Sequence, residues 1–112
     1  MKLPKLDQIQ QKQIRDKLSS YALNFTHEDG QHKARLFQAK LGINLNNQEK
    51  LITAIFEAVN TQSVIYSTTS QYGEKYVIDF IMETDIGSSK IRSAWIIRCE
   101  ENYPRLTSIY PI

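Results

Sequence analysis

The segment EKYVIDFIME, residues 74–83, alternates between apolar and polar side chains and carries the clearest structural signal in the chain. A period of two is typical of a β-strand that buries one face and exposes the other. One face holds the large apolar side chains, namely Tyr76, Ile78, Phe80 and Met82. The opposite face holds Lys75, Val77, Asp79 and Ile81. The segment therefore predicts a strand of an antiparallel sheet with one face open to solvent.

Three more segments after residue 60 are rich in β-branched and aromatic residues. They read SVIYSTTS (63–70), KIRSAWIIRC (90–99) and RLTSIYPI (105–112). The turns between them are short, so we expect four strands in an antiparallel meander. Alternation places Trp95 in the core. In the last strand it places Arg105 and Thr107 on one face and Tyr110 on the other.

The first sixty residues have helical periodicity instead. Apolar residues recur loosely from Asp7 to Ala22, and a second helical pattern runs from Gln31 to Leu41, where Gly42 ends it. A third apolar stripe follows in residues 46–60, with Asn46 and Glu49 at the spacing of a capping box. Two to three helices followed by a four-stranded meander predict an α+β fold. We expect a single domain over residues 1–112, with the helices packed on one sheet face.

Length and composition exclude several classes of protein. With 112 residues, 41% of them hydrophobic, the chain has the size of one domain and too many apolar residues for disorder. Cys99 is the only cysteine, which excludes an intramolecular disulfide and makes a reducing cytoplasm the expected location. No run reaches the ~20 apolar residues that cross a bilayer, and no signal-peptide pattern follows Met1. We therefore expect a cytoplasmic protein that does not enter the membrane.

The net charge of +2 is too small to indicate nucleic-acid binding by itself. Residues 1–60 carry nine Lys and Arg against six Asp and Glu, whereas residues 61–112 carry five against six. The helical half is therefore basic and the strand half near neutral. This distribution is compatible with a surface that faces RNA.

Both histidines of the chain fall in YALNFTHEDGQHKARLF, residues 21–37. His27 comes just before the second predicted helix, and His32, Lys33 and Arg35 lie on its first turns. An imidazole titrates near neutral pH and can act as general acid or base, while Lys33 and Arg35 can hold a phosphate. The alternative is a polar helix start with solvated side chains. Cations there oppose the helix dipole, a local conflict that is more frequent at functional sites.

The sequence does not favour a metal, a cofactor or a protein nucleophile. His27 and His32 are five residues apart, which does not stack them on one helix face, and no His-Glu-x-x-His motif occurs. Cys99 is most simply a small core residue. No nucleophile elbow and no glycine-rich phosphate loop is present. Any catalysis is therefore expected to be independent of metals and cofactors.

The strands supply a second group of candidate residues. Arg92 and Arg98 share a strand face, and Arg105, Thr107 and Tyr110 follow in the last strand. A basic sheet face with tyrosine and threonine can hold RNA through base stacking and phosphate contacts. The alternative is a solvent-facing side of an antiparallel sheet, which is polar in any case.

Four blocks of the chain, in this order, resemble a family of small bacterial and phage-associated domains of unknown function, number 6883 in its series. They read KLSSYALN..H..G.HKARLF...LG (17–42), YGEKYVIDFIM (72–82), IRSAWIIR (91–98) and YPRLTSIY (103–110). The resemblance covers almost the whole chain. It implies a toxin-like module, encoded alone beside the gene of a small partner or at the end of a larger protein. The order of helices followed by a four-stranded antiparallel sheet is also similar to that of the RelE, barnase and EndoU ribonucleases.

This resemblance implies roles for several residues. His27 would act as acid or base, Lys33 would hold the phosphate, and Arg105 and Thr107 would stabilise the transition state. Glu28 and Asp29 depart from the family pattern, in which proline and uncharged residues follow the histidine, and would repel a phosphate unless they point away.

We therefore expect an RNA-cleaving or RNA-binding, toxin-like module. Its catalytic candidates are His27, His32, Lys33, Arg105 and Thr107, and its RNA-binding candidates are Arg35, Arg92, Arg98 and Tyr110. A small acidic, antitoxin-like protein is the expected partner. The alternative is a non-enzymatic module that binds an acidic protein partner through its basic helical half and its polar sheet edge. The oligomeric state does not follow from the sequence.

Overall fold

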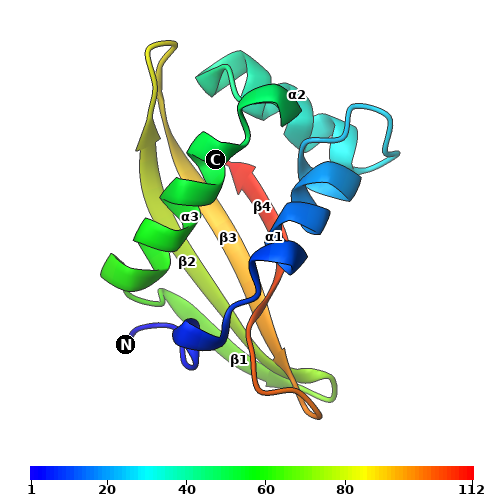
Figure 1. The fold of residues 1–112 in the computed structure, drawn as a ribbon. Helices are drawn as coiled ribbons and strands as arrows, with labels where there is room; N and C mark the ends of the chain where they lie inside the picture. Colours follow the sequence, from blue (N-terminus) through cyan, green and yellow to red (C-terminus); the bar gives the residue numbers. More distant parts are fainter.

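The computed structural model describes residues 1–112 and contains one four-stranded antiparallel sheet (Figure 1). The strands lie in chain order, so each pairs with the strand before it. They are β1 (Tyr66–Ser70), β2 (Gly73–Glu83), β3 (Ser88–Arg98) and β4 (Arg105–Pro111). Three helices precede this sheet and pack on it, which confirms the predicted α+β fold and the four-stranded meander.

The helices are α1 (Gln11–Lys17), α2 (Gly30–Leu41) and α3 (Glu49–Thr61). The helix α3 buries the predicted apolar stripe, and α2 ends as expected at Gly42, whose φ of 67° lies in the left-handed region that glycine adopts without strain. In Figure 1, α1 and α2 lie on the β4 side of the sheet, and α3 lies beside β2. None of these helices has the length and apolar character that would span a membrane.

The segment from Asp7 to Ala22 is not one helix. A 3-10 turn, η1 (Leu6–Gln8), comes before α1, and a short π-helix, η2 (Leu18–Ala22), follows it. The wider turn is closed by the Leu23 N–H, which donates to the Leu18 carbonyl at 2.8 Å. Both of these leucines are fully buried. A π-helical turn holds one residue more than an α-helical turn. Leu18 and Leu23, which are five residues apart, can therefore both face the core.

The predicted capping box at Asn46 and Glu49 is wrong. The box forms instead between Asn44 and Asn47, around the 3-10 turn η3 (Leu45–Asn47). The Asn44 side chain accepts the Asn46 N–H and the Asn47 side chain accepts the Asn44 N–H, each at 2.8 Å. The asparagine side chains therefore cap the 3-10 turn and not α3, which begins at Glu49.

The core lies between the helices and one sheet face. Tyr76, Ile78, Phe80 and Met82 are buried on that face as predicted, and Trp95 joins them with 1% exposure. The indole N–H of Trp95 donates to Ser93 Oγ at 3.0 Å, and that hydroxyl donates to the Ile78 carbonyl at 2.8 Å. The largest core side chain therefore has its polar atom satisfied.

A β-bulge changes the last strand. Ser108 pairs with Ala94 while Leu106 pairs with Trp95, so Thr107 is an extra residue in β4. The extra residue shifts the alternation, and Tyr110 lies opposite Arg92 on the open face of the sheet, the face that also carries Arg105. The prediction that Tyr110 lies on the other face is therefore wrong. The sequence pattern assumed an unbroken period of two.

The β4 edge of the sheet is closed by a side chain. The amide of Gln13 in α1 donates to the Leu106 carbonyl at 2.9 Å and accepts the Leu106 N–H at 2.8 Å. The Gln13 side chain thus makes the two hydrogen bonds that a neighbouring strand would make. This contact fixes α1 against the edge of the sheet.

We expect Gln13→Ala to lower the free energy of unfolding by about 1–3 kcal/mol, because it leaves both partly buried backbone groups of Leu106 without their partner. Gln11→Ala is the matched control, since Gln11 lies on the same helix, is exposed and makes no side-chain hydrogen bond. Urea denaturation of both variants measures the difference. Equal stability of the two variants would show that the contact does not hold α1.

Candidate nucleic-acid interface

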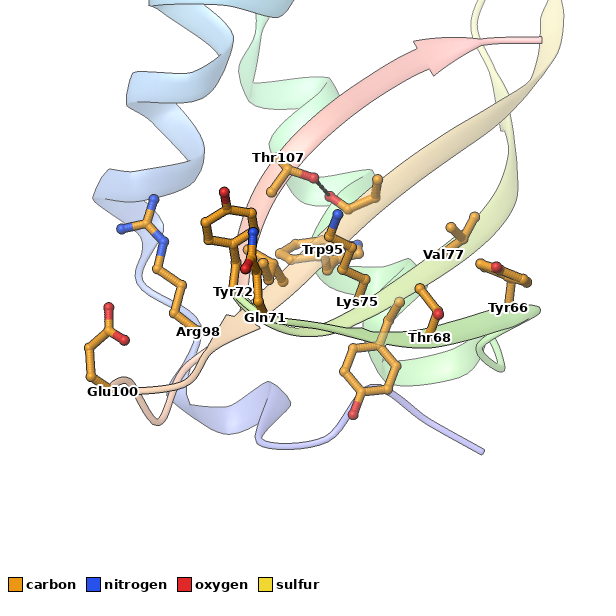
Figure 2. A pocket seen from close by; sticks show the side chains of 13 residues that line it. Tyr66, Thr68, Gln71, Tyr72, Lys75, Val77, Trp95, Arg98, Glu100 and Thr107 are labelled. Atoms are coloured by element: carbon orange, nitrogen blue, oxygen red, sulfur yellow. Dashed lines mark hydrogen bonds between the residues drawn. The ribbon is translucent and has the colours of Figure 1, made fainter.

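The sheet face that points away from the helices carries the largest hollow in the molecule, of about 730 Å³ (Figure 2). Its floor is the middle of the sheet, and one end of it is formed by the turn between β1 and β2. Side chains that line it include Tyr66, Thr68, Gln71, Tyr72, Lys75, Val77, Ala94, Ile96, Arg98 and Thr107. Two predicted site residues, Arg98 and Thr107, therefore share this hollow.

Two tyrosines, two cations and one carboxylate, that of Glu100, give the hollow its chemical character. Tyr66 is 60% exposed and Tyr72 is 65% exposed, so both rings are available for stacking. Lys75 forms no ion pair, and Arg98 lies 3.9 Å from Glu101, at the outer limit of an ion pair. Thr107 is less available, because its hydroxyl already donates to the Ala94 carbonyl at 3.0 Å.

Arg92 lies elsewhere on the same face and is neutralised. Its guanidinium donates to both oxygens of Asp79 at 3.0 and 2.9 Å, and the Asp79 side chain is only 6% exposed. The pKa of Arg92 is raised, first by these hydrogen bonds and then by the charge of Asp79. A phosphate at Arg92 would therefore compete with an existing bidentate pair.

Arg105 is held in the same way. It donates to both oxygens of Glu101 at 2.8 Å and also contacts the hydroxyl of Tyr103. The hydrogen bonds from Arg105, followed by that from Tyr103, lower the pKa of Glu101 from 4.5 to about 2. Arg105 lines a shallower depression beside α1 and not the main hollow.

A second cluster lies at the β4 edge and consists of Tyr21, His27, Lys33 and Tyr110; we call it the Tyr21 cluster. The ammonium of Lys33 donates to the Tyr21 hydroxyl at 2.9 Å and lies 5.5 Å from the centre of the Tyr110 ring. Its contacts include no carboxylate. Lys33 is thus an unneutralised cation held against two aromatic rings.

The backbone packing that places Tyr21 requires a glycine. Tyr21 belongs to the π-helix η2, and the start of α2 lies directly against its carbonyl. A Cβ atom at Gly30 would be 2.0 Å from the Tyr21 carbonyl oxygen. A larger residue at Gly30 would push α2 away from η2 and separate Lys33 from Tyr21.

His27 caps α2. Its Nδ1 accepts the backbone N–H groups of Asp29 at 3.0 Å and Gly30 at 2.9 Å, and its ring packs edge-on against Tyr21, with centroids 4.8 Å apart. Nδ1 therefore acts as an acceptor, so the proton of the neutral ring lies on Nε2. This is the contact that an Asp or Ser side chain makes at other helix starts.

The two remaining candidates lie outside both clusters. His32 is exposed on α2, and its side chain makes no hydrogen bond or ion pair. Arg35 is exposed as well and bonds only to Gln31, at 3.3 Å. Of the expected catalytic residues, the structure thus joins His27 and Lys33 through Tyr21, and separates His32 and Arg105 from them.

Four residues that supply the rings and cations of these sites were not identified from the sequence as site residues: Tyr21, Tyr66, Tyr72 and Lys75. Tyr72 lies between two predicted strands, and Tyr66 lies in a segment that the sequence marks only as rich in β-branched and aromatic residues. An aromatic residue in a turn beside a polar sheet face is a signal that could have pointed to Tyr72. Nothing local to Tyr21 indicates that Lys33 and Tyr110 meet there.

Comparison with known families agrees with the block resemblance seen in the sequence. The model of the family described as "Domain of unknown function (DUF6883)" matches residues 2–112. The chain belongs to this family. No curated protein and no solved structure matches the DUF6883 chain. Its site is therefore interpreted from its own geometry.

We expect His27→Ala to lower the free energy of unfolding by about 1 kcal/mol, since two N–H groups at the start of α2 lose their acceptor. His27→Asn should restore most of that stability, because asparagine is a good capping residue. Thermal or urea denaturation measures both. If the two variants are equally stable, the proposed capping role of His27 is wrong.

Glu101 predicts a pH dependence of stability. Its pKa is about 2 in the folded protein against an ordinary 4.5, so the ionised form favours folding. The contribution is complete above pH 4.5 and is lost as the pH falls from 4.5 towards 2. Glu101→Gln should remove this component, whereas Glu100→Gln, at an exposed neighbour without an ion pair, should retain it. Urea denaturation at pH 7 and pH 3 tests this, and parallel losses in all three proteins would contradict it.

Proposed function

We propose that this DUF6883 domain binds single-stranded RNA in the cytoplasm, with the RNA lying across the open face of the sheet. The observation that carries the proposal is the hollow of about 730 Å³, flanked by the exposed rings of Tyr66 and Tyr72 and by the cations of Lys75 and Arg98. Bases stack on such rings while the phosphates between them meet the cations.

The character of the hollow favours single strands. An aromatic ring on an open sheet can stack only on a base that is unpaired and splayed out, and duplex RNA does not present its bases in this way. Tyr72 projects from a turn and Tyr66 from the edge strand β1, at separate places around the hollow. Two separated stacking positions suit a short run of nucleotides rather than one bound base.

The cations that carry no close, bidentate ion pair support modest rather than tight binding. Lys75 and Arg98 border the hollow, and Lys33 lies at the β4 edge, where it could hold a third phosphate. Arg92 and Arg105 are already bound to carboxylates. Three phosphate contacts on a chain of net charge +2 imply binding that weakens clearly with salt.

The contacts support binding more than cleavage. A metal-independent cut would use the 2′-hydroxyl as nucleophile, with His27 or His32 moving protons and Lys33, Arg105 and Thr107 supporting the phosphate. His27 Nδ1 is engaged with backbone N–H groups, and Arg105 and Thr107 have partners of their own. Cleavage, the toxin-like role and a small acidic partner stay predictions from the resemblance to toxins and ribonucleases.

The test is a titration of fluorescent eight-nucleotide RNAs, oligo(U) and oligo(A), and of an RNA duplex, followed by anisotropy. We expect the single strands to bind and Tyr72→Ala or Lys75→Glu to weaken binding about tenfold. The slope of log affinity against log salt should be about −2, and Lys75→Glu should reduce it by about 0.7. Lys40→Glu is the matched control, since Lys40 is exposed on α2 and lines no part of the hollow.

Equal binding by all variants, or tighter binding to the duplex, would contradict the proposed interface. Absence of RNA binding altogether would favour the alternative of a module that binds only proteins. Electrophoresis of the same RNA after incubation reports on cleavage: fragments from the wild type and not from His27→Asn would give His27 a catalytic role.

A further inference from the structure

A stretch of sheet edge in this fold has no neighbour. β1 pairs with β2 only from Gly73 to Val77, whereas β2 continues to Glu83. The remaining segment, Ile78–Glu83, borders β3 on one side and no strand on the other. We call this segment the free β2 edge. At about 3.4 Å per residue it is roughly 20 Å long, enough for a complete added strand.

The backbone groups on this edge are unpaired. The Val77 carbonyl accepts the Ile65 N–H on the β1 side, while the Tyr72 carbonyl accepts the Cys99 N–H on the β3 side. Odd-numbered residues of β2 therefore direct their backbone groups towards the β1 side. Asp79, Ile81 and Glu83 accordingly point their N–H and C=O groups outward, and none of these groups is hydrogen-bonded to another part of the chain.

A groove runs along the same edge. Two adjoining depressions of about 480 and 380 Å³ lie between the free β2 edge and α3, and both are bordered by Ala54, Glu57 and Ile81. The small side chains of Ala54 and Ala58, four residues apart on α3, leave room above the strand. Phe80 and Met82 supply apolar surface on the strand side.

We propose that this groove takes an extended peptide segment of a protein partner, which adds to β2 as an antiparallel strand. Alternating donors and acceptors spaced two residues apart are complemented by another extended backbone. Neither a base nor a phosphate offers that pattern.

The walls of the groove define the chemistry of this segment. Five charged side chains line it: two cations, Lys50 and Lys90, and three anions, Glu57, Asp79 and Glu83. Because Asp79 is already paired with Arg92, the remaining two cations and two anions balance. The segment that fits is therefore uncharged, with small or β-branched apolar side chains at the alternate positions that face α3.

A second copy of this chain fits the edge poorly. In the register that pairs all three outward residues, Ile81 meets Ile81 and each Asp79 meets Glu83 of the other copy. Both oxygens of Asp79 are already occupied by Arg92, so this register offers Glu83 no oppositely charged partner and lacks the charge complementarity that favours a strand pair. The outer edge of β1 is a weaker candidate than β2, because the hollow that β1 borders, through Tyr66 and Thr68, lies over the open face of the sheet and not between the strand and a helix.

The test uses the full chain and a synthetic probe, a blocked seven-residue peptide of alternating threonine and valine. We expect its addition to shift the amide NMR signals of Asp79, Ile81 and Glu83 and to slow their hydrogen exchange. Ile81→Pro should weaken binding at least about tenfold, because it removes one outward N–H and its ring blocks the approaching strand. Ser67→Pro is the matched control, placing the same change on the outer edge of β1.

Three results would overturn the proposal. They are the absence of any shift at millimolar peptide, shifts confined to residues of β1, and a wild-type dimer in sedimentation that Ile81→Pro converts to monomers. The last would assign the edge to a second copy. The wild-type shifts decide the first two results even if the proline variants fail to fold. RNA binding on the open face is measured separately, so either proposal can fail without the other.

Discussion

The antiparallel pairing of β2 with β3 runs through all eleven residues of each strand and sets the place of the other elements. Because large apolar residues alternate along both strands, the pair has one apolar face, which the helices bury. The helices leave open a mixed face, on which Lys75 and Arg98 lie beside Val77 and Ile96. The apolar face holds Trp95, whose indole is tied through Ser93 to the Ile78 carbonyl. Burial on one side only therefore creates both the core and the surface on which we propose that RNA binds.

The basic side chains on and around the open face differ in availability. Arg92 and Arg105 are each held by both oxygens of a carboxylate, and their charge is compensated where they stand. Lys33 and Lys75 have no such partner. A count of lysines and arginines would treat all four alike, whereas their contacts separate those that brace the sheet from those that can attract a phosphate.

The two edges of the sheet differ in how their backbone groups are hydrogen-bonded. At β4, the Gln13 side chain takes the place of a neighbouring strand and satisfies both backbone groups of Leu106. At β2, the neighbour β1 ends opposite Val77, and the rest of the edge stays open beside α3. An exposed edge invites strand pairing, so natural proteins usually cover it or place charges on it. The edge left open here is the docking site that we propose for an extended segment.

Local periodicity was sufficient to determine the order of the elements, the meander and the burial of alternate β2 residues such as Ile78 and Phe80, because each depends on neighbours in the sequence. It failed for Tyr110, since the bulge at Thr107 depends on how β4 meets β3 and leaves no local mark. The sequence also identified Lys33 as a candidate residue but not the residues around it. The contact between Lys33 and Tyr110 joins α2 to the last strand, so it depends on two distant segments. Such contacts between distant segments are decided by tertiary packing, which no pattern within either segment encodes.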